Sequence, residues 1–472
     1  MKTNFNTRKF RGGAYATVLS AVVLAILVFV NLIVSGLDLT VDLTSGSKYS
    51  LTEETVSMLE TLEEDITVYY LAPSTESIDW FDKILGQYAK HSGHLTLITK
   101  DPEINPRFAA QYTEEDIESF SLIVVNEATG RSRYIPCSDM ILTETSLDYS
   151  TYQYVTKQTG LDMEGQLNSA IAYVTSGHLP TLYQVTGHGE QTLGSNTLAM
   201  LEKANVLVES ITLLTASEIP EDCDVLLIHT PQNDFAESEI RLLEEYKSRG
   251  GKIIFALSYM DTEHPALLAL VNSFGIELAD GILMEENTRY YMQSPNYLLP
   301  VKSANSFTSN LSDKYIIAQV ASGLTKNAEA GESLSFTEIL STSSTAYNKS
   351  TNATTFYKEE GDLSGKFYVG LYAEDSLTGA GAAVYSALYL FYDDYAASSA
   401  FGNINLLINT VNTLSEADTS MATVRTISLE EDSYLLLTEA QANTIGAIVV
   451  IVLPLGILVA GICFVVYRRK HA

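Results

Sequence analysis

Residues 221–258 read EDCDVLLIHTPQNDFAESEIRLLEEYKSRGGKIIFALS, and this stretch decides the fold of the chain. Two apolar runs, 224–230 and 252–258, flank a segment with helical periodicity at 236–249. Both runs are continuous rather than alternating, as parallel strands covered on both faces of a sheet require. The stretch therefore predicts a β-α-β unit of a doubly wound α/β domain.

The helical segment of this unit has one apolar face. Ile240, Leu243 and Tyr246 recur at a spacing of three residues, so we expect them to face the sheet, with the acidic residues and Arg241 turned away. Gly250 stands where a left-handed residue commonly ends a helix. A helix that packs on the sheet through one face fits the doubly wound interpretation.

The doubly wound domain is expected to span 179–418. Before the central unit we predict a strand at 181–186, a glycine-rich turn, a helix at 197–204 and a strand at 206–214. After it, 366–375 and 383–394 are predicted as the last strands and 403–415 as a closing helix. Residues 419–444 are expected to be a linker.

A second α/β domain is predicted at 38–178, opened by a capping box of Ser50 and Glu53. Its elements follow the order β-α-β-α-β-β-α of thioredoxin-like domains: strands at 66–71, 94–100, 121–126 and 131–137, and helices at 78–92, 106–112 and 163–176. Thioredoxins carry a CxxC motif before their first core helix. Residues 72–79 read APSTESID at that point, so no redox chemistry is expected.

Two uncharged segments lie near the ends of the chain, at 14–34 and 445–467. A membrane helix needs roughly 20 apolar residues, so both are predicted to be transmembrane. The tails at 1–13 and 468–472 are basic, which predicts cytoplasmic termini and an extracytoplasmic portion at 36–444 of a plasma-membrane protein. The rival interpretation of the first segment is a cleaved signal peptide.

The second of these segments contains Pro454 and Gly456 near its middle. A kink there is tolerated in lipid when neighbouring helices satisfy the freed backbone carbonyl. Pro454 and Gly456 are therefore the candidate contact with a helical partner.

The charge of the chain excludes one class of partner. The formal net charge is −30, and nucleic-acid binding needs clustered Lys and Arg, so no nucleic acid is expected. Cys137 and Cys223 are isolated, without metal-ligand spacing, and a disulfide between them is allowed but not required. We expect no metal and no cofactor.

The candidate ligand-binding residues lie in two turns that each follow a predicted strand. Gly187, His188, Gly189 and Glu190 form the first turn, and the segment Pro231-Gln232-Asn233-Asp234 forms the second. Ligands of α/β sheets bind at the carboxyl ends of strands, so the turns could converge in one pocket, with Gln232 and Asp234 beside His188 and Glu190.

A structural interpretation of these turns remains open. The glycines would then serve a tight turn, and the His and Glu side chains would cap neighbouring backbone. Asp234 and Glu237 have the spacing of a capping box, which by itself accounts for much of the second turn.

Catalytic motifs are missing from the sequence. There is no GxxxxGK[ST] motif for ATP and no GxSxG, and Cys223 lies in the context EDCDV before a strand rather than on a strand-to-helix turn. We therefore predict a protein that is not an enzyme and that depends on partners for energy and for a transport pathway.

Several stretches resemble one family: DLTSGSKYSLTEETVSMLETL, LYQVTGHGE, the segment from EDCDVLLIHT to GGKIIF, and GNINLLINTVNTL. The chain is similar to the GldG-like auxiliary components of gliding-motility-type ABC transporters. The resemblance implies an extracytoplasmic, glutamine-amidotransferase-like α/β domain without catalytic residues. It also implies a separate ABC ATPase subunit and a multi-helix permease as partners. Residues 290–360 depart from the family pattern.

Three functions follow from these observations. The leading one is an auxiliary subunit of an ABC transport complex, which binds substrate or braces the permease. The second is an envelope scaffold or sensor. The third is a degenerate amidotransferase-like hydrolase that would use His188 and Glu190.

Overall fold

The computed structural model describes residues 22, 50–148, 153–327, 331–397, 400–417 and 427–428. Within these residues, no helix combines the length and apolar character needed to cross a membrane. The predicted helices at 14–34 and 445–467 lie outside the described residues, apart from Val22, as do Pro454 and Gly456. The fold prediction is therefore corrected to a mixed α/β fold. The predicted plasma-membrane location with cytoplasmic termini is contradicted by the same finding.

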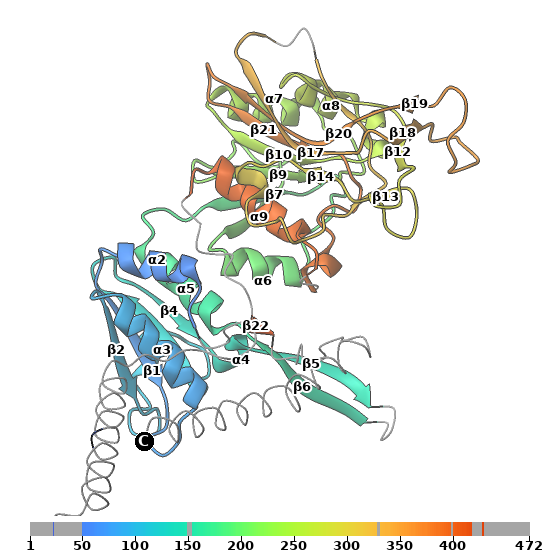
Figure 1. Cartoon of the computed structure of the whole chain (residues 1–472). Helices are drawn as coiled ribbons and strands as arrows, with labels where there is room; N and C mark the ends of the chain where they lie inside the picture. The colour runs from blue at the N-terminus through green and yellow to red at the C-terminus, as the bar shows by residue number, and fades with distance from the viewer. Residues whose placement is uncertain are drawn as a thin grey trace, which may run out of the picture. The chain divides into compact units, whose positions relative to one another are not determined.

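A four-stranded sheet in the order β2-β1-β3-β4 organises the N-terminal part (Figure 1). Strands β1 and β2 are parallel, and β3 is antiparallel to β1 and to β4. The strands are β1 (Ile66–Leu71), β2 (Leu95–Lys100), β3 (Ser121–Asn126) and β4 (Arg131–Ile135), and the helices are α2 (Glu53–Thr61), α3 (Asp79–His91), η1 (Ala109–Gln111), α4 (Cys137–Met140) and α5 (Met163–Thr175).

Apolar side chains of α2, α3 and α5 share one core with this sheet, including Leu59, Phe81 and Leu167. The other face of the sheet packs against the segment around η1 through Ile123, Phe108 and Tyr112. Helix α2 begins after Thr52, whose hydroxyl accepts from Thr55 N, so the predicted Ser50–Glu53 capping box is wrong.

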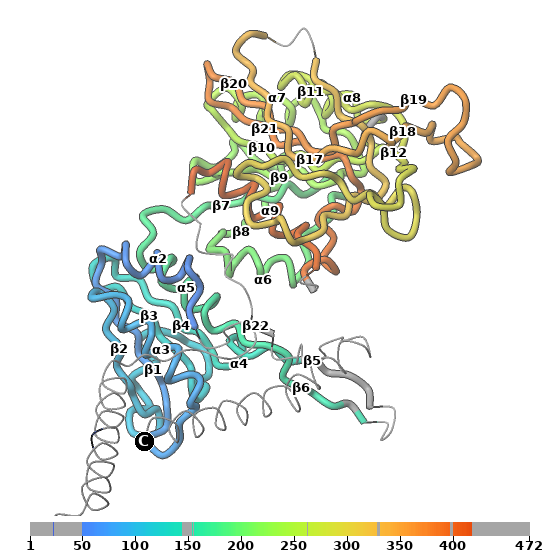
Figure 2. Tube along the Cα trace, in the orientation of Figure 1, coloured from blue at the N-terminus to red at the C-terminus, as the bar shows by residue number. Residues whose placement is uncertain are grey.

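Strands β5 (Ile141–Asp148) and β6 (Gln153–Leu161) form a long hairpin, to which β22 (Ile427–Ser428) adds a short third strand (Figure 2). The hairpin was not predicted because its sequence, ILTETSLD followed by QYVTKQTGL, is polar and lacks an apolar alternation. A buried face is what gives a strand its period of two, and this hairpin has little to bury.

The C-terminal part is built on a ten-stranded sheet, with the main order β11-β16-β20-β21-β10-β9-β7-β8. Strands β8, β7, β9, β10 and β21 are parallel, and β20 runs antiparallel to β21. The strands are β7 (Thr181–Val185), β8 (Leu207–Ile211), β9 (Val225–His229), β10 (Lys252–Ala256), β11 (Ile276–Leu278), β14 (Val301–Lys302), β16 (Leu324–Lys326), β17 (Leu334–Ser341), β20 (Tyr368–Asp375) and β21 (Gly381–Tyr385).

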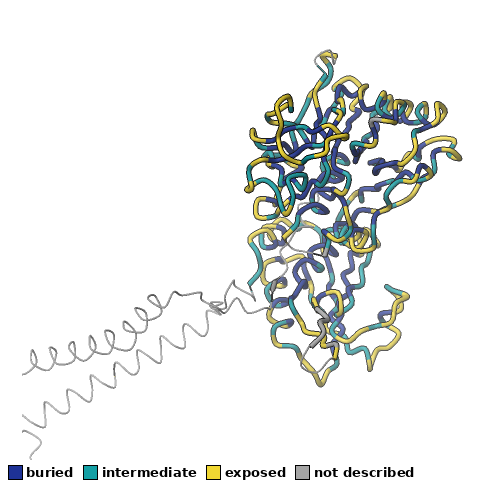
Figure 3. The backbone as a smooth tube through the Cα atoms, turned by 90° about the vertical axis from the view of Figure 1, so that its right-hand side faces the viewer, coloured by how far each residue is buried: buried dark blue, intermediate teal, exposed yellow. Residues whose placement is uncertain are grey.

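Helices cover both faces of this sheet, as the continuous apolar strands require. Alternate residues of β9 point to opposite cores: Leu227 packs on the side of α6 (Ser195–Lys203) and α9 (Asn403–Leu414), and Leu226 on the side of α7 (Glu237–Ser248) and α8 (Pro265–Asn272). Figure 3 colours the backbone by burial and shows buried stretches (dark blue) alternating with exposed ones (yellow). Burying each such leucine contributes about 1.5–3 kcal/mol.

Small elements complete the C-terminal part. They are the strands β12 (Ile282–Glu285), β13 (Tyr297–Leu298), β15 (Ala318–Gln319), β18 (Ala346–Lys349) and β19 (Leu363–Ser364), and the short helices η2 (Tyr259–Glu263), η3 (Ser306–Thr308) and η4 (Asp393–Ala397). Residues Leu51–Leu429 form one compact unit, so the predicted boundary between domains at 178 and 179 stays a prediction.

Candidate functional site

The two candidate turns lie side by side at the switch point of the C-terminal sheet. Strand β7 pairs with β8 on one side and with β9 on the other, so the connections that leave β7 and β9 diverge to opposite faces. In open α/β sheets, ligands bind at the carboxyl ends of strands at such a point. The turn at 187–190 follows β7, and the turn at 231–234 follows β9.

Backbone hydrogen bonds join the two turns. The carbonyl oxygen of His188 accepts from Gln232 N at 2.8 Å and from Asn233 N at 3.0 Å. Gly189 has a φ of +78°, and a Cβ there would lie 3.1 Å from the Cβ of Gln232. Glycine is therefore required at 189 both for its left-handed conformation and for the close approach of the second turn.

His188 is buried and held between two carboxylates. Its Nδ1 lies 3.1 Å from Glu190 Oε1, and its Nε2 lies 3.0 Å from Glu239 Oε2. Its ring also stacks on Phe235, with centroids 4.1 Å apart. A neutral imidazole has one N–H and can donate to only one of the two carboxylates. Both contacts are hydrogen bonds only when one more proton is present, on the ring or on one of the carboxylates.

Glu239 is the member of this trio that the sequence analysis missed. It was expected to face solvent, but it is 2% exposed, because it lies in the first turn of α7 beneath His188. Its Oε2 also accepts from Ala236 N at 2.9 Å, while its Oε1 is buried without a hydrogen-bond partner in the described structure. Glu239 is the third residue of α7, three positions after Ala236, and a glutamate at that position often caps a helix N-terminus. This position is the sequence signal that could have revealed it.

Asp234 serves a different element from the one predicted. Its carboxylate accepts from Ala266 N at 2.9 Å and from Leu267 N at 3.0 Å, so it caps the N-terminus of α8. Helix α7 begins after Ala236, and the predicted capping box of Asp234 and Glu237 is wrong. The turns thus bring His188, Gly189, Glu190 and Gln232 together, whereas Asp234 is used to hold α8.

Two further histidines lie at the same edge of the sheet. Burial lowers the pKa of His229, at the end of β9, to about 4, so its imidazole is neutral at pH 7. After β10, Asp261 accepts from Ser258 Oγ at 3.1 Å and lies 2.9 Å from His264 Nδ1. Burial raises the pKa of Asp261 despite these donors. Sequence patterns did not single out these residues.

Residues 173–372 match the family described as "ABC-type uncharacterized transport system". This part of the chain is similar to that family. The matched range contains both candidate turns and the parallel strands β7 to β10. The resemblance to auxiliary components of ABC transport systems is confirmed, and the family favours a role other than catalysis.

Solved structures give more distant similarities. The mmIFT52 N-terminal domain is 15% identical, with a TM-score of 0.38 over 50% of this chain and 98% of that chain. SMU.1228c is 11% identical, with a TM-score of 0.27 over 51% of this chain and 97% of that chain. The exo-β-1,4-mannosidase Op5Man5 from Opitutaceae bacterium strain TAV5 is 11% identical, with a TM-score of 0.25 over 72% of this chain and 48% of that chain. No curated protein matches the chain.

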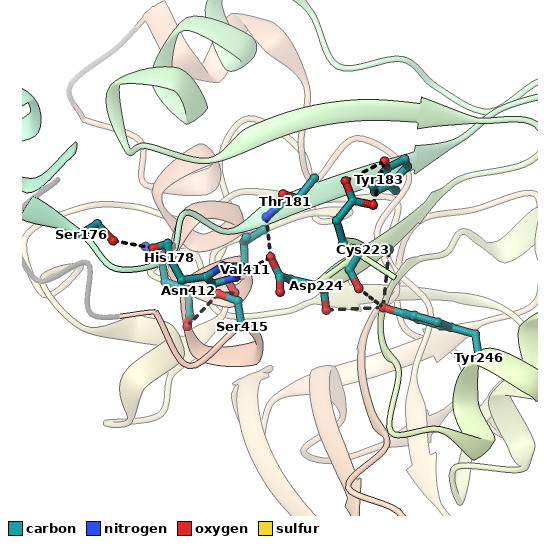
Figure 4. Close-up of polar contacts among 11 residues, drawn as sticks. Ser176, His178, Thr181, Tyr183, Cys223, Asp224, Tyr246, Val411, Asn412 and Ser415 are labelled. Atoms are coloured by element: carbon teal, nitrogen blue, oxygen red, sulfur yellow. Dashed lines mark hydrogen bonds and ion pairs between the residues drawn. The ribbon is translucent and has the colours of Figure 1, made fainter. Parts of the chain in front are cut away.

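Cys223 precedes β9, so it lies at the opposite end of that strand from the turn at 231–234. Figure 4 shows Cys223 beside Asp224 and Tyr246. Its thiol donates to Tyr246 Oη at 3.5 Å. Burial raises the pKa of Cys223 to about 11, so the reactive thiolate is scarce at pH 7. Cys223 and Cys137 are both free thiols, which excludes a disulfide between them.

A cavity of about 260 Å³ lies in the N-terminal part, away from the candidate turns. It opens beside the carboxyl ends of β1 and β2 and is lined by Leu71, Lys100, Asp101, Phe108 and Ile117, among others. Across the described part of the chain, no group of three or more His, Cys, Asp or Glu residues could hold a metal ion.

Proposed function

We propose that this chain is an auxiliary subunit that braces the permease of an ABC transport complex, with the ATPase supplied by another subunit. The match of residues 173–372 to an ABC-type transport family is the observation that carries the proposal. The sequence adds that the chain has no nucleotide-binding GxxxxGK[ST] motif of its own. A separate ATPase must then provide the energy for transport.

The geometry of the candidate turns supports bracing over catalysis. Both ring nitrogens of His188 face carboxylates, so neither is free to activate a hydroxyl or thiol nucleophile. The trio of His188, Glu190 and Glu239 instead ties the turn after β7 to the first turn of α7. We infer that this trio is a structural lock that keeps the switch-point surface rigid.

A solute-binding role is the second candidate, and the cavity beside β1 and β2 favours it. Its volume of about 260 Å³ is near the lower end of ligand pockets, which begin at roughly 300 Å³. A thermal-shift screen of the purified chain tests this role, because a ligand of the folded state raises the melting temperature.

Co-purification tests the leading proposal. The tagged chain, produced at its natural level in its own host, should bring down one ABC ATPase and one multi-helix permease in mild detergent. Tagging the permease should recover this chain in return. Recovery of the chain without either subunit in both directions would contradict the proposal.

A further inference from the structure

The connection between β18 and β19 projects from the C-terminal part of the molecule (Figures 1 and 2). It carries two exposed aromatic side chains, Phe356 and Tyr357, of which Tyr357 is 81% exposed, and Leu363 at the start of β19 is exposed as well. Scattered single apolar residues are common on protein surfaces, but two adjacent exposed aromatic residues in a projecting loop are costly to leave in water.

A buried lysine holds the base of this loop. Lys349 is 2% exposed, and its Nζ lies 2.6 Å from Glu359 Oε2 and 2.9 Å from Asp362 Oδ2. Burial acts to lower the pKa of Lys349, but the hydrogen bonds to Glu359 and Asp362 outweigh it and raise that pKa. The lysine is therefore charged at neutral pH and fixes the chain after Tyr357 to the end of β18.

One hydrogen bond holds the aromatic pair itself, and a second holds the chain that follows it. The hydroxyl of Tyr347, in β18, donates to the carbonyl oxygen of Phe356. Beyond the pair, Glu359 N donates to Asp362 Oδ2 at 2.7 Å. These contacts restrain the loop before a partner binds, which reduces the entropy cost of association.

The charge around the aromatic pair indicates the kind of partner. Glu359 and Asp362 pair with Lys349, so Lys349 and residues 350–364 together carry two lysines against three acids, a net charge of −1, on a chain whose net charge is −30. Lys358 Nζ also forms an ion pair with Glu286 Oε2, at 3.7 Å. Such a surface repels anionic lipid headgroups and attracts a protein pocket rimmed by Lys or Arg.

We propose that the loop at 350–364 is the docking element by which this chain holds the permease. Phe356 and Tyr357 insert into an apolar pocket of the permease, and Glu360 pairs with basic residues at its rim. Aromatic side chains at the centre of an interface commonly dominate its affinity. The inference rests on the proposed function, since it assigns the surface that the bracing role requires.

The test compares permease capture by three tagged full-length chains: the wild type, F356S/Y357S and L377S. Leu377 is the matched control, because it is 84% exposed and lies in the turn between β20 and β21. We expect F356S/Y357S to lose capture about tenfold or more, as for interface hot spots. L377S should capture permease as the wild type does, and all three chains should have equal melting temperatures.

Each other outcome contradicts a definite part of the account. Equal capture by F356S/Y357S and the wild type would overturn the docking loop while leaving the proposed function intact. A wild type that captures no permease would overturn the proposed function, and the loop assignment with it. Flotation of the wild type, but not F356S/Y357S, on phosphatidylcholine vesicles would identify a lipid occupant and overturn the choice of a protein.

A second variant tests the conformational part of the proposal. K349M removes the clamp but keeps both aromatic side chains. We expect K349M to weaken capture severalfold, because the loop must then be ordered during binding. Capture as strong as the wild type would show that the Lys349 clamp does not prepare the loop.

Discussion

His188 lies in a motif that invites a catalytic interpretation, and we propose a structural role for it. Its glycine neighbours, its position after a strand and its nearby glutamate all suited a ligand-binding turn. The folded chain uses the same features to bury the imidazole between Glu190 and Glu239. The motif and Glu190 were identified from the sequence. Glu239 was not, because it lies in α7, 51 residues after His188.

Replacing His188 by Ala should destabilise the protein strongly. The variant removes the imidazole that lies between the buried carboxylates of Glu190 and Glu239, and leaving buried carboxylates without their partner costs about 3–5 kcal/mol. Urea unfolding at pH 7 measures this loss. H178A is the control: the His178 side chain is 60% exposed beside Asp224, so its removal should cost about 1 kcal/mol or less.

A loss below about 1 kcal/mol for H188A would contradict the structural-lock interpretation, since surface ion pairs contribute that little. The turn would then tolerate its two carboxylates alone. A ligand or proton that replaces the imidazole would become the better explanation of the motif.

Secondary structure could be predicted wherever the buried residues of an element form a recognisable apolar pattern in the local sequence. The strands predicted at 66–71, 224–230 and 252–258 correspond to β1, β9 and β10 because their residues are apolar on both faces. By contrast, the strands β11 to β18 were not predicted, because all of them except β17 are only two to four residues long, too short to show a period of two. Helix α8 was missed although Pro265 marks its first turn.

Capping of helix α6 illustrates what local sequence cannot reveal. Asp393, in η4, accepts from Thr197 N and from Thr197 Oγ1, both at 2.8 Å, across 196 residues of sequence. Gly194, at the start of the helix, has no side chain to cap it. The nearest carboxylate in space takes that role, and only the folded topology determines which residue this is.

Replacing Asp393 by Ala should destabilise the protein by about 1 kcal/mol at pH 7, the usual cost of a lost N-cap. Burial acts to raise the pKa of Asp393, but its hydrogen bonds from Thr197 and Asn196 outweigh burial and lower it. Because the folded pKa lies below the unfolded value of about 3.9, the contribution is complete above that pH and is lost as the pH falls through the folded pKa.

The difference between the wild type and D393A should therefore shrink below about pH 4, as measured by thermal unfolding across the range. D394A is the matched control, because Asp394 is the exposed neighbouring residue in η4. An effect of D393A that does not change with pH would rule out capping by the charged carboxylate.

At the scale of the molecule, the N-terminal and C-terminal parts have separate hydrophobic cores. The clusters around Leu59 and Ile123 involve the four-stranded sheet, and those around Leu226 and Leu227 involve the ten-stranded sheet. The links between the parts include polar contacts such as the ion pair of Lys203 with Asp162. The main strands and helices of each part could be predicted because each core is built from residues close together in the sequence, whereas the division into two domains stays a prediction.

Calorimetry of the full chain should consequently show two overlapping transitions, with a calorimetric enthalpy larger than the van't Hoff enthalpy. K203M should move the transitions further apart by removing a link between the parts. Equal calorimetric and van't Hoff enthalpies would mean that residues 51–429 unfold as a single cooperative unit, and the predicted boundary at 178 and 179 would be wrong.

Reciprocal co-purification from the natural host tests the central claim most directly, because an auxiliary subunit must be found with its transporter. The account predicts that the tagged chain recovers one ABC ATPase and one permease, and that the tagged permease recovers this chain. If neither direction recovers the other subunits, while the chain itself is folded and present, the chain does not act as an auxiliary subunit of an ABC transport complex.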